Sequence, residues 1–474
     1  MYKLHLILKY LRKRRIAWVS LVAVTLCTAM VLVVISVMGG WLRMFKEGFH
    51  GVTGDIVVTR QGTYSGFPYY EKMLEKIERI PEVRGAAPIL RTGGLFHVAN
   101  IRDLVQVVGL QPEKMHLVNK FRDSLYLQNE KFGPATRPAT FDKPFRDEVY
   151  RQSLPGSRAD PANWPGMIVG TYLILNKDEQ GQIERPDLMY RVPVKLTVMG
   201  ISDDMDSLDP QTKAERRYWI VDDSRMKIWQ VDNKTVYVPF DVLQRDLKME
   251  AFEGEPARTS EIAIGLKDGA DLAAARAKVE AAVAEVCHEY SLNFVPSAEA
   301  KSSMLGAPIR VMTWQEINAD FIAAVENEKV LLIILFAIIS VVAVFLIFCI
   351  FYMIVAEKTR DIGIVKSVGA TSAGVAQIFL GYGLTIGLTG AVLGTAAGWW
   401  VVHNINWLHE QIGRLLGVKV WDPKTYAFDT IPNTINPKEM IVIFIVAIIA
   451  SVIGSLVPAI RAAQLNPVEA LRWE

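Results

Sequence analysis

The sequence has no Gly-x-x-x-x-Gly-Lys-Ser/Thr loop, and none of its 33 glycines is followed by lysine. Such a loop cradles nucleotide phosphates with its backbone amides, so the usual ATP-binding motif is absent. The seven histidines form no His-Glu-x-x-His pair, and no Ser/His/Asp set stands at a recognisable spacing. These absences predict a chain that is not an enzyme and has no catalytic, cofactor-binding or metal-ligating residues.

The acidic stretch at 201–209, ISDDMDSLD, holds four acidic residues and is a candidate divalent-ion site. It departs from the calcium-loop pattern, which requires a glycine at the sixth position and a late glutamate. A solvated loop is the better interpretation, with an ion site as the alternative.

Cysteine is scarce, and net charge is small. Cys27 and Cys349 lie in predicted membrane spans, and Cys287 stands alone in the segment between the first two spans. No intramolecular disulfide framework is therefore expected there. A formal net charge of +2 gives no strong field that would attract nucleic acid, so nucleic acid is not expected as a partner.

Four stretches lack aspartate, glutamate, lysine and arginine altogether: 16–38, 330–355, 371–402 and 440–460. Each exceeds the roughly 18 apolar residues that indicate a membrane-spanning helix. Buried helices of a large soluble protein are the alternative, but core helices seldom run uncharged over so many turns. The sequence predicts an α-helical membrane protein with four transmembrane helices.

Basic residues set the predicted orientation: Lys9, Arg12, Lys13, Arg14 and Arg15 precede the first span. Because basic residues concentrate on the cytoplasmic side, both termini are predicted to be cytoplasmic. Residues 1–15 read as an amphipathic helix on the inner leaflet, with a frayed tail as the alternative. The predicted order is then 16–40 first span, 41–312 periplasmic domain, 313–355 stalk and second span, 356–370 cytoplasmic helix, 371–402 third span, 403–439 periplasmic loop, 440–460 fourth span and 461–474 cytoplasmic tail.

The large external segment mixes strand and helix patterns. Strand-like GDIVVTR (54–60) and LVQVVGL (104–110) flank an amphipathic helix at 69–80, and EIAIGL (261–266) precedes a helix at 271–286. This order predicts a large α+β extracytoplasmic domain made of a discontinuous α/β lobe. A β-rich lobe at about 118–250, opening with a proline-rich segment at 130–165, is predicted to be inserted into it.

A stalk is predicted before the second span. Thr313 and Glu316 form a capping box, in which each side chain bonds the other residue's backbone amide. No proline or glycine interrupts 314–355, which as one helix would span roughly 63 Å at about 1.5 Å per residue. The surplus over a bilayer core predicts a rigid stalk that includes Phe321 and Ala324, with a helix broken near Asn327 as the alternative.

A short cytoplasmic helix is predicted between the second and third spans. Gly369 suits the position just after it, and Thr371 suits the cap of the next span. Its apolar side is predicted to dock a soluble partner, with an interfacial turn resting on lipid as the alternative. The predicted contact residues are Glu357, Lys358, Arg360, Asp361, Ile362, Val365, Lys366, Val368 and Gly369. Of these, Ile362, Val365 and Val368 would enter the partner's groove.

The third span contains Gly383, Gly387, Gly390, Gly394 and Gly398, and the pairs 383/387, 390/394 and 394/398 have four-residue spacing. Such spacing allows close approach of helices in lipid, which predicts a packing role for all five. After the fourth span, Asn466 and Pro467 predict the start of a short terminal helix at 467–473.

Four segments resemble the permease subunits of lipoprotein-releasing ABC transporters, the LolC/LolE type within the wider MacB/FtsX-like group. They are LKYLRKRRIAWVSLVAVTLCTAMVLVVISVMGGW, the stretch from WQEINADF to KSVGATSAGV, FDTIPNTI, and LVPAIRAAQLNPVEALRWE. The likeness covers the predicted membrane part nearly completely. It is weaker in the external domain, where residues 118–165 look longer and more irregular than in the family.

The resemblance implies an ABC ATPase dimer docked on the cytoplasmic helices of two permeases, the second being another copy or a different chain. ATP and magnesium would be held by the ATPase, and its hydrolysis would drive the external domain to lift a lipoprotein from the inner membrane. A periplasmic chaperone is a further partner, although no chaperone-binding hook is carried over. The alternatives are MacB-like export of peptides or small molecules and FtsX-like regulation of cell-wall hydrolases.

Overall fold

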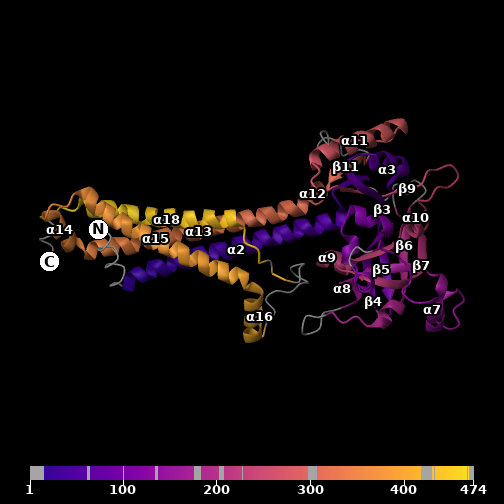
Figure 1. Ribbon diagram of the computed structural model, residues 1–474, viewed down its shortest axis with the longest axis horizontal. Helices are drawn as coiled ribbons and strands as arrows, with labels where there is room; N and C mark the ends of the chain where they lie inside the picture. Colours follow the sequence, from indigo (N-terminus) through magenta and orange to yellow (C-terminus); the bar gives the residue numbers. More distant parts are fainter. Residues whose placement is uncertain are drawn as a thin grey trace. The chain divides into compact units, whose positions relative to one another are not determined.

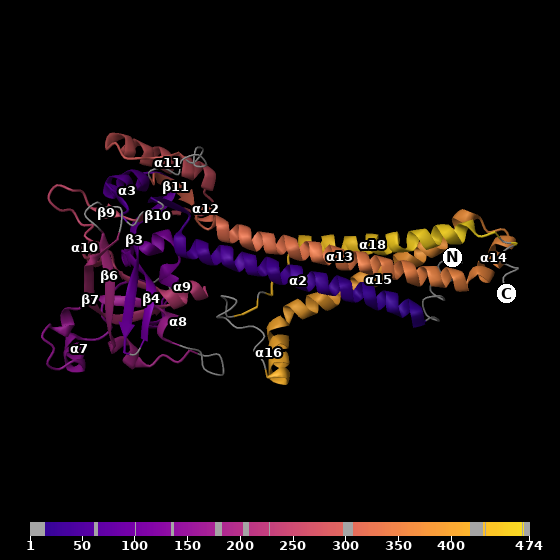
Figure 2. The ribbon, with the colours of Figure 1, turned by 180° about the vertical axis from the view of Figure 1, so that it is seen from behind.

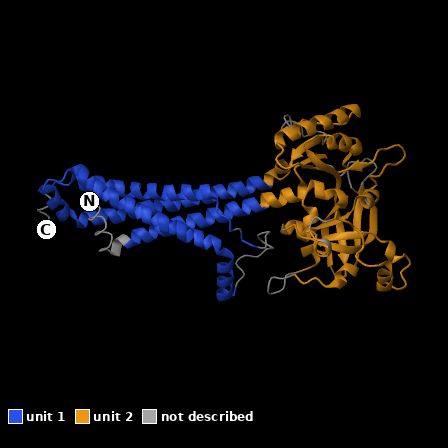
Figure 3. Ribbon diagram, in the orientation of Figure 1, with its two compact units in different colours: residues 1–44, 321–422, 430–474 blue, residues 45–320, 423–429 orange. Residues whose placement is uncertain are grey.

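The computed structural model describes residues 15–60, 65–99, 101–133, 137–175, 183–201, 208–226, 228–296, 307–417, 430–431, 433–466 and 468. They divide into two compact units (Figure 3). The first takes its described residues from 1–44, 321–422 and 430–474, and the second consists chiefly of 45–320. The amphipathic helix predicted at 1–15 and the terminal helix predicted at 467–473 lie almost wholly outside the described residues.

Four helices are long and apolar enough to cross a membrane. They are α2 (Arg15–Thr53), α13 (Ala319–Glu357), α15 (Ser372–His403) and α18 (Pro437–Gln464) (Figure 1). Each contains one of the four uncharged stretches, so the prediction of four membrane helices with an α+β domain between the first and second is confirmed. Large apolar side chains such as Leu331, Phe345 and Val442 remain exposed on their surfaces, as expected of helices surrounded by lipid.

The first sheet of the second unit runs in the order β11-β1-β10-β3. Its strands are β1 (Ile56–Arg60), β10 (Glu261–Leu266), β11 (Ile309–Thr313) and the first part of β3 (Val83–Val98). Helices α3 (Tyr70–Glu78) and α11 (Leu272–Glu289) pack on it. Met73, Ile77, Val279 and Val283 repeat every three or four residues on these helices and are fully buried, which places one apolar face of each helix against the strands.

The second sheet closes on itself. It runs β3-β4-β8-β5-β7-β6, and β6 returns to pair with β3 through Gly94–Val198 and His97–Lys195. The added strands are β4 (Ile101–Leu110), β5 (Gly166–Gly170), β6 (Pro193–Ile201), β7 (Leu208–Ser224) and β8 (Thr235–Pro239). Each strand of this sheet therefore has a partner on both sides over part of its length, which limits the exposed strand edges.

Strand β3 belongs to both sheets. It pairs with β10 as far as Ile89 and with β4 from Leu90 onward. The α/β lobe is therefore formed by two separate segments of the chain, and the β-rich lobe is formed by the segment between them. The predicted discontinuous lobe with a β-rich insertion is confirmed. The second sheet also uses residues 90–110, which precede the predicted limits of about 118–250.

The smaller elements connect or cover the strands of the second unit. The helices are α4 (Pro112–Val118), α5 (Phe121–Ser124), α6 (Leu127–Phe132), α7 (Asp147–Ser153), α8 (Thr171–Ile174), α9 (Trp229–Lys234), α10 (Phe240–Asp246) and α12 (Trp314–Ile317). Two short strands, β2 (Phe67–Pro68) and β9 (Arg258–Thr259), pair with each other, and single 3-10 turns lie at Pro161–Asn163 and Asp187–Arg191.

Buried polar contacts fix the proline-rich segment to β7. The Trp219 indole donates to the Pro161 carbonyl at 2.6 Å. The Asp222 carboxylate accepts the backbone amides of Leu127 and Gln128, at 2.8 and 3.0 Å, and so caps α6 from another element. These bonds hold Leu127, Gln128 and Pro161 against β7 of the sheet.

The Asp222 carboxylate should make the stability of the domain depend on pH. Burial raises its pKa to about 7, although the donated amides oppose this shift. An acid with a raised folded-state pKa contributes most stability below its unfolded-state pKa, and that contribution is lost as pH rises through the folded-state pKa. We expect the thermal midpoint of the full chain in detergent to fall by a few degrees between pH 5 and 7.5.

The matched variant is Asp222→Asn, which removes the titrating group and whose single amide oxygen can accept from one of the two α6 amides that donate to Asp222. Its thermal midpoint should change less over the same pH range. Equal slopes for the two proteins would contradict an Asp222 proton gained on folding.

Candidate functional site

Helix α14 (Thr359–Ser367) is the short helix between the second and third spans. It ends at Val368, and Gly369 follows with a left-handed φ of +106°, a conformation that glycine adopts without strain. Thr371 then caps α15 by accepting the Gly374 amide at 3.1 Å. The predicted roles of Gly369 and Thr371 in helix termination and capping are confirmed.

One face of α14 is buried against its own chain. Ile362 is 6% exposed and clusters with Val355, Val375 and Ala462, from the ends of α13, α15 and α18. The prediction that Ile362 enters a partner's groove is therefore wrong. Its side chain is already covered because the ends of the spans converge on this face of the helix.

Lys366 also serves the chain itself. Its ammonium group donates to the carbonyls of Ala463 and Leu465 at 2.9 and 2.7 Å. These carbonyls lie at the C-terminus of α18, where a positive charge is favourable. These bonds tie α14 to the end of the last span. Lys366 is only half-buried, and its place among the partner-contact residues stays a prediction.

Removal of this tie should weaken the end of α18. We expect Lys366→Met to destabilise the detergent-purified chain by about 1–2 kcal/mol, because two charge-assisted hydrogen bonds are lost. Lys366→Arg keeps the charge and is the matched control. The measurement is thermal unfolding, and a Met variant as stable as the Arg variant would show that the tie contributes nothing.

The opposite face of α14 is open. Arg360, Ile364 and Val368 follow each other at four-residue spacing and are exposed, with Val368 85% and Ile364 47% accessible. Val365 is half-buried beside them, and the charged turn before the helix contains an ion pair between Lys358 and Asp361. We call Arg360, Ile364 and Val368 the outer ridge of α14.

Sequence reasoning missed Ile364. Two apolar faces compete on so short a helix, and the spacing of Ile362, Val365 and Val368 was as regular as that of the outer ridge. Lys366 could have indicated the correct face. Its side chain bonds the carbonyls at the end of α18, and this contact determines which side of α14 faces the spans.

The predicted stalk is capped as expected and interrupted where it was not expected. Thr313 and Glu316 make both bonds of the capping box. Helix α12 then ends at Ile317, and α13 starts at Ala319. The prediction of one uninterrupted helix over 314–355 is wrong at Asn318, where the backbone leaves helical geometry with φ −101° and ψ 17°. The Trp314 carbonyl there accepts both the Asn318 backbone amide, at 3.3 Å, and the Asn318 side-chain amide, at 2.8 Å. Phe321 and Ala324 lie in the first turns of α13, beyond this break.

The five glycines of α15 face two different helices. A Cβ atom on Gly383 would lie 2.5 Å from Ser455 Cβ, and one on Gly387 would lie 2.7 Å from Ser451 Cβ, both on α18. The remaining three approach α2: Gly390 lies near Val24, Gly394 near Thr28 and Gly398 near Leu32. One half of α15 thus packs closely on α18 and the other half on α2.

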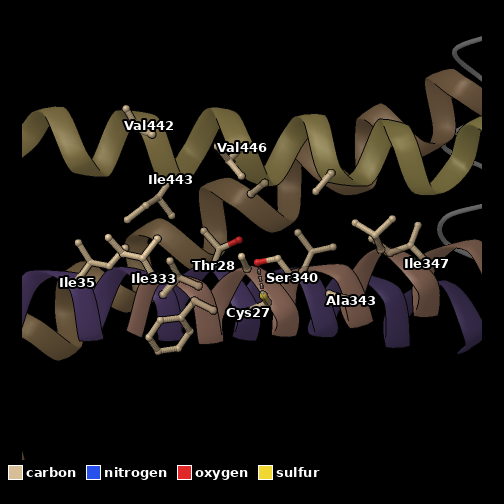
Figure 4. A pocket seen from close by; sticks show the side chains of 17 residues that line it. Cys27, Thr28, Ile35, Ile333, Ser340, Ala343, Ile347, Val442, Ile443 and Val446 are labelled. Atoms are coloured by element: carbon tan, nitrogen blue, oxygen red, sulfur yellow. Dashed lines mark hydrogen bonds between the residues drawn. The ribbon is translucent and has the colours of Figure 1, made fainter. Parts of the chain in front are cut away.

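An apolar cavity of about 250 Å³ lies among α2, α13 and α18 (Figure 4). Its wall is aliphatic and aromatic, with Phe336 as the aromatic residue, apart from a few small polar groups. Among these are Cys27 and Ser340, whose Sγ and Oγ atoms are 4.0 Å apart. Such a lining suits an apolar chain and has no group arranged for acid–base chemistry. Among the described residues no cluster of potential metal ligands occurs, and the acidic loop at 201–209 lies largely outside them.

These features define a class. Four membrane helices, a two-sheet domain between the first two and a short exposed helix between the next two are the parts of a membrane permease with an external domain. Comparison with family models agrees: residues 17–282 match the MacB-like periplasmic core domain, more than half of the chain, and residues 333–467 match the FtsX-like permease C-terminal region. The chain belongs to the family of permeases that carry a MacB-like periplasmic core domain.

Among curated proteins, the chain is similar to the lipoprotein-releasing system transmembrane proteins LolC of Xylella fastidiosa and LolC of Neisseria meningitidis. They are 28% identical over 170 residues and 31% identical over 164 residues, which is 36% and 35% of this chain. LolE of Haemophilus influenzae is 31% identical over 119 residues, 25% of this chain. The matched segments span only 41%, 40% and 29% of the length of these relatives.

Proposed function

We propose that the chain is the permease subunit of an ABC transporter that releases lipoproteins from the bacterial inner membrane. A separate ATPase dimer would bind the outer ridge of α14 on the cytoplasmic side, and a second permease would complete the transporter. ATP hydrolysis would move the periplasmic domain, which would lift the acylated cargo out of the bilayer. Relatives named for lipoprotein release support the choice of cargo.

The outer ridge is the observation that carries this proposal. An apolar surface on a polar turn needs a partner, and this one belongs to a helix anchored by Ile362 and Lys366 to the ends of three spans. Force applied to the ridge would therefore reach those spans directly. The apolar cavity among α2, α13 and α18 is compatible with the acyl chains of a lipoprotein.

The test is release of an acylated lipoprotein from proteoliposomes containing the chain and its co-purified partners. The informative variant is Ala324→Pro, in which proline removes a backbone donor in the first turns of α13 at a cost of about 3 kcal/mol or more. We expect ATP hydrolysis to persist and release to be lost, whereas the control Ala324→Ser should release normally.

Normal release by Ala324→Pro would show that α13 does not transmit the motion.

Co-purification separately tests the identity of the cargo. An acylated lipoprotein supports the proposal, while an outer-membrane channel or a cell-wall hydrolase in its place would favour export or regulation.

A further inference from the structure

Helix α16 (Ile405–Leu416) was not expected from the sequence, in which residues 403–439 were a loop. A single residue, Asn404, separates it from the end of α15 at His403. Figures 1 and 2 show that α16 turns sharply from α15 and runs across the direction of the four long helices of its unit. A helix with this orientation lies parallel to the plane of a membrane that the long helices cross.

The side chains of α16 divide into two faces. At about 100° per residue, Ile405, Leu408, Ile412, Leu415 and Leu416 fall on one side. Asn406, Glu410 and Arg414 fall on the other side, together with Trp407, which is 54% exposed. Leu415 is 86% exposed, Leu416 63% and Ile412 41%, and no residue of the helix is buried. The described part of the chain therefore leaves this apolar face largely uncovered.

The polar face is attached to the chain. The Asn406 side-chain amide donates to the Ile431 carbonyl at 3.0 Å, and its oxygen accepts the Ile431 amide at 2.9 Å. This pair of bonds joins α16 to the segment that leads into α18, so the helix is held by its polar side. The apolar face is directed elsewhere.

The depth of α16 follows from the end of α15. Trp399 and Trp400 occupy the last turn of that span and are each 50% exposed, while Val392 and Leu393 one to two turns earlier are exposed apolar residues. Tryptophan concentrates at the membrane–water boundary. Since α16 begins only five residues after Trp400, it starts close to this boundary, and its apolar face continues the lipid-facing surface of α15.

We propose that α16 is an interfacial helix that binds the lipid surface on the side of the large domain, with its apolar face inserted among the acyl chains. Amphipathic helices with leucine and isoleucine on one side and charged residues on the other bind membranes in this way. The occupant of the exposed face is then bilayer lipid. This inference depends on the membrane helices and is independent of the cargo or of any ATPase.

The test uses the full chain in liposomes with Cys27, Cys287 and Cys349 replaced by serine. A single cysteine carrying an environment-sensitive NBD fluorophore is placed by Leu415→Cys or, as the matched control, by Glu410→Cys. The probe is phosphatidylcholine and phosphatidylglycerol with a nitroxide at carbon 5 of the acyl chain. We expect several-fold stronger quenching of the label at 415, and stronger quenching by aqueous iodide of the label at 410.

Equal and weak quenching by the lipid nitroxide at both positions would overturn the proposal. Protection of the label at 415 from both quenchers, with cross-linking between copies, would also overturn it and assign the face to a second copy of the chain. Both labels replace exposed side chains, and circular dichroism of each labelled protein verifies that the helices are retained before quenching is compared.

Discussion

Replacing Gly383 with leucine is expected to prevent the third and fourth spans from packing. Even the first carbon of a side chain would come within 2.5 Å of Ser455 Cβ, and the Gly383 carbonyl already accepts a hydrogen bond from the Ser451 hydroxyl at 3.0 Å. Rotation of the Ser455 hydroxyl cannot relieve this overlap, because the position of the Ser455 Cβ is set by the backbone of α18. Insertion of even one or two methylenes into a packed core costs about 1–3 kcal/mol, so four added carbons should exceed this range.

The expected result is loss of monodisperse protein after detergent extraction, with insertion into the membrane retained. Ala397→Leu is the matched control, since Ala397 is exposed on the same helix and should face lipid. A Gly383→Leu protein as stable as the Ala397→Leu protein would show that α15 and α18 are not in close contact.

If an ATPase docks on the outer ridge as proposed, replacing Ile364 with aspartate is expected to abolish the stimulation of its activity by this chain. The change places a charge in the middle of the outer ridge, where the proposed groove would have to desolvate it. Truncation or charge reversal at the centre of an interface typically costs 2 kcal/mol or more, so association should weaken at least about 30-fold. The measurements are co-purification of the two proteins and nucleotide hydrolysis after reconstitution.

Ser367→Asp is the control, because it adds the same charge at an exposed position of α14 next to the ridge. Full stimulation of ATP hydrolysis by the Ile364→Asp protein would show that the outer ridge is not the docking surface. The same change at Ile362 would be uninformative, since that residue is buried with Val355, Val375 and Ala462 and a charge there should disrupt the chain's own packing.

Local patterns explain what the sequence could predict. An uncharged run long enough for a bilayer, a Thr–Glu capping box at 313 and 316, and a glycine at 369 each depend on residues close to one another in the chain. The order of strand and helix patterns in the external segment likewise fixed the discontinuous lobe with its insertion.

The errors have different sources. The break at Asn318 is local: its backbone leaves helical geometry while its side chain bonds the Trp314 carbonyl, which the absence of proline and glycine does not reveal. The orientation of α14 depends on the end of α18, almost 100 residues later in the chain. Helix α16 is short and amphipathic, and only one residue separates it from the third span. The apolar residues of the span therefore make the start of α16 hard to recognise in the sequence.

The sharing of β3 between two sheets has a consequence for the order in which the domain folds. The closed sheet uses residues 90–239, whereas β1, at 56–60, must wait for its partners β10 at 261–266 and β11 at 309–313. Loops of about 200 residues close slowly, and contacts between residues far apart in sequence form late. The inserted sheet can therefore assemble first while β1 stays unpaired. Until β10 and β11 have been synthesised, the edges of that early strand are open to proteases and to wrong pairing with other chains.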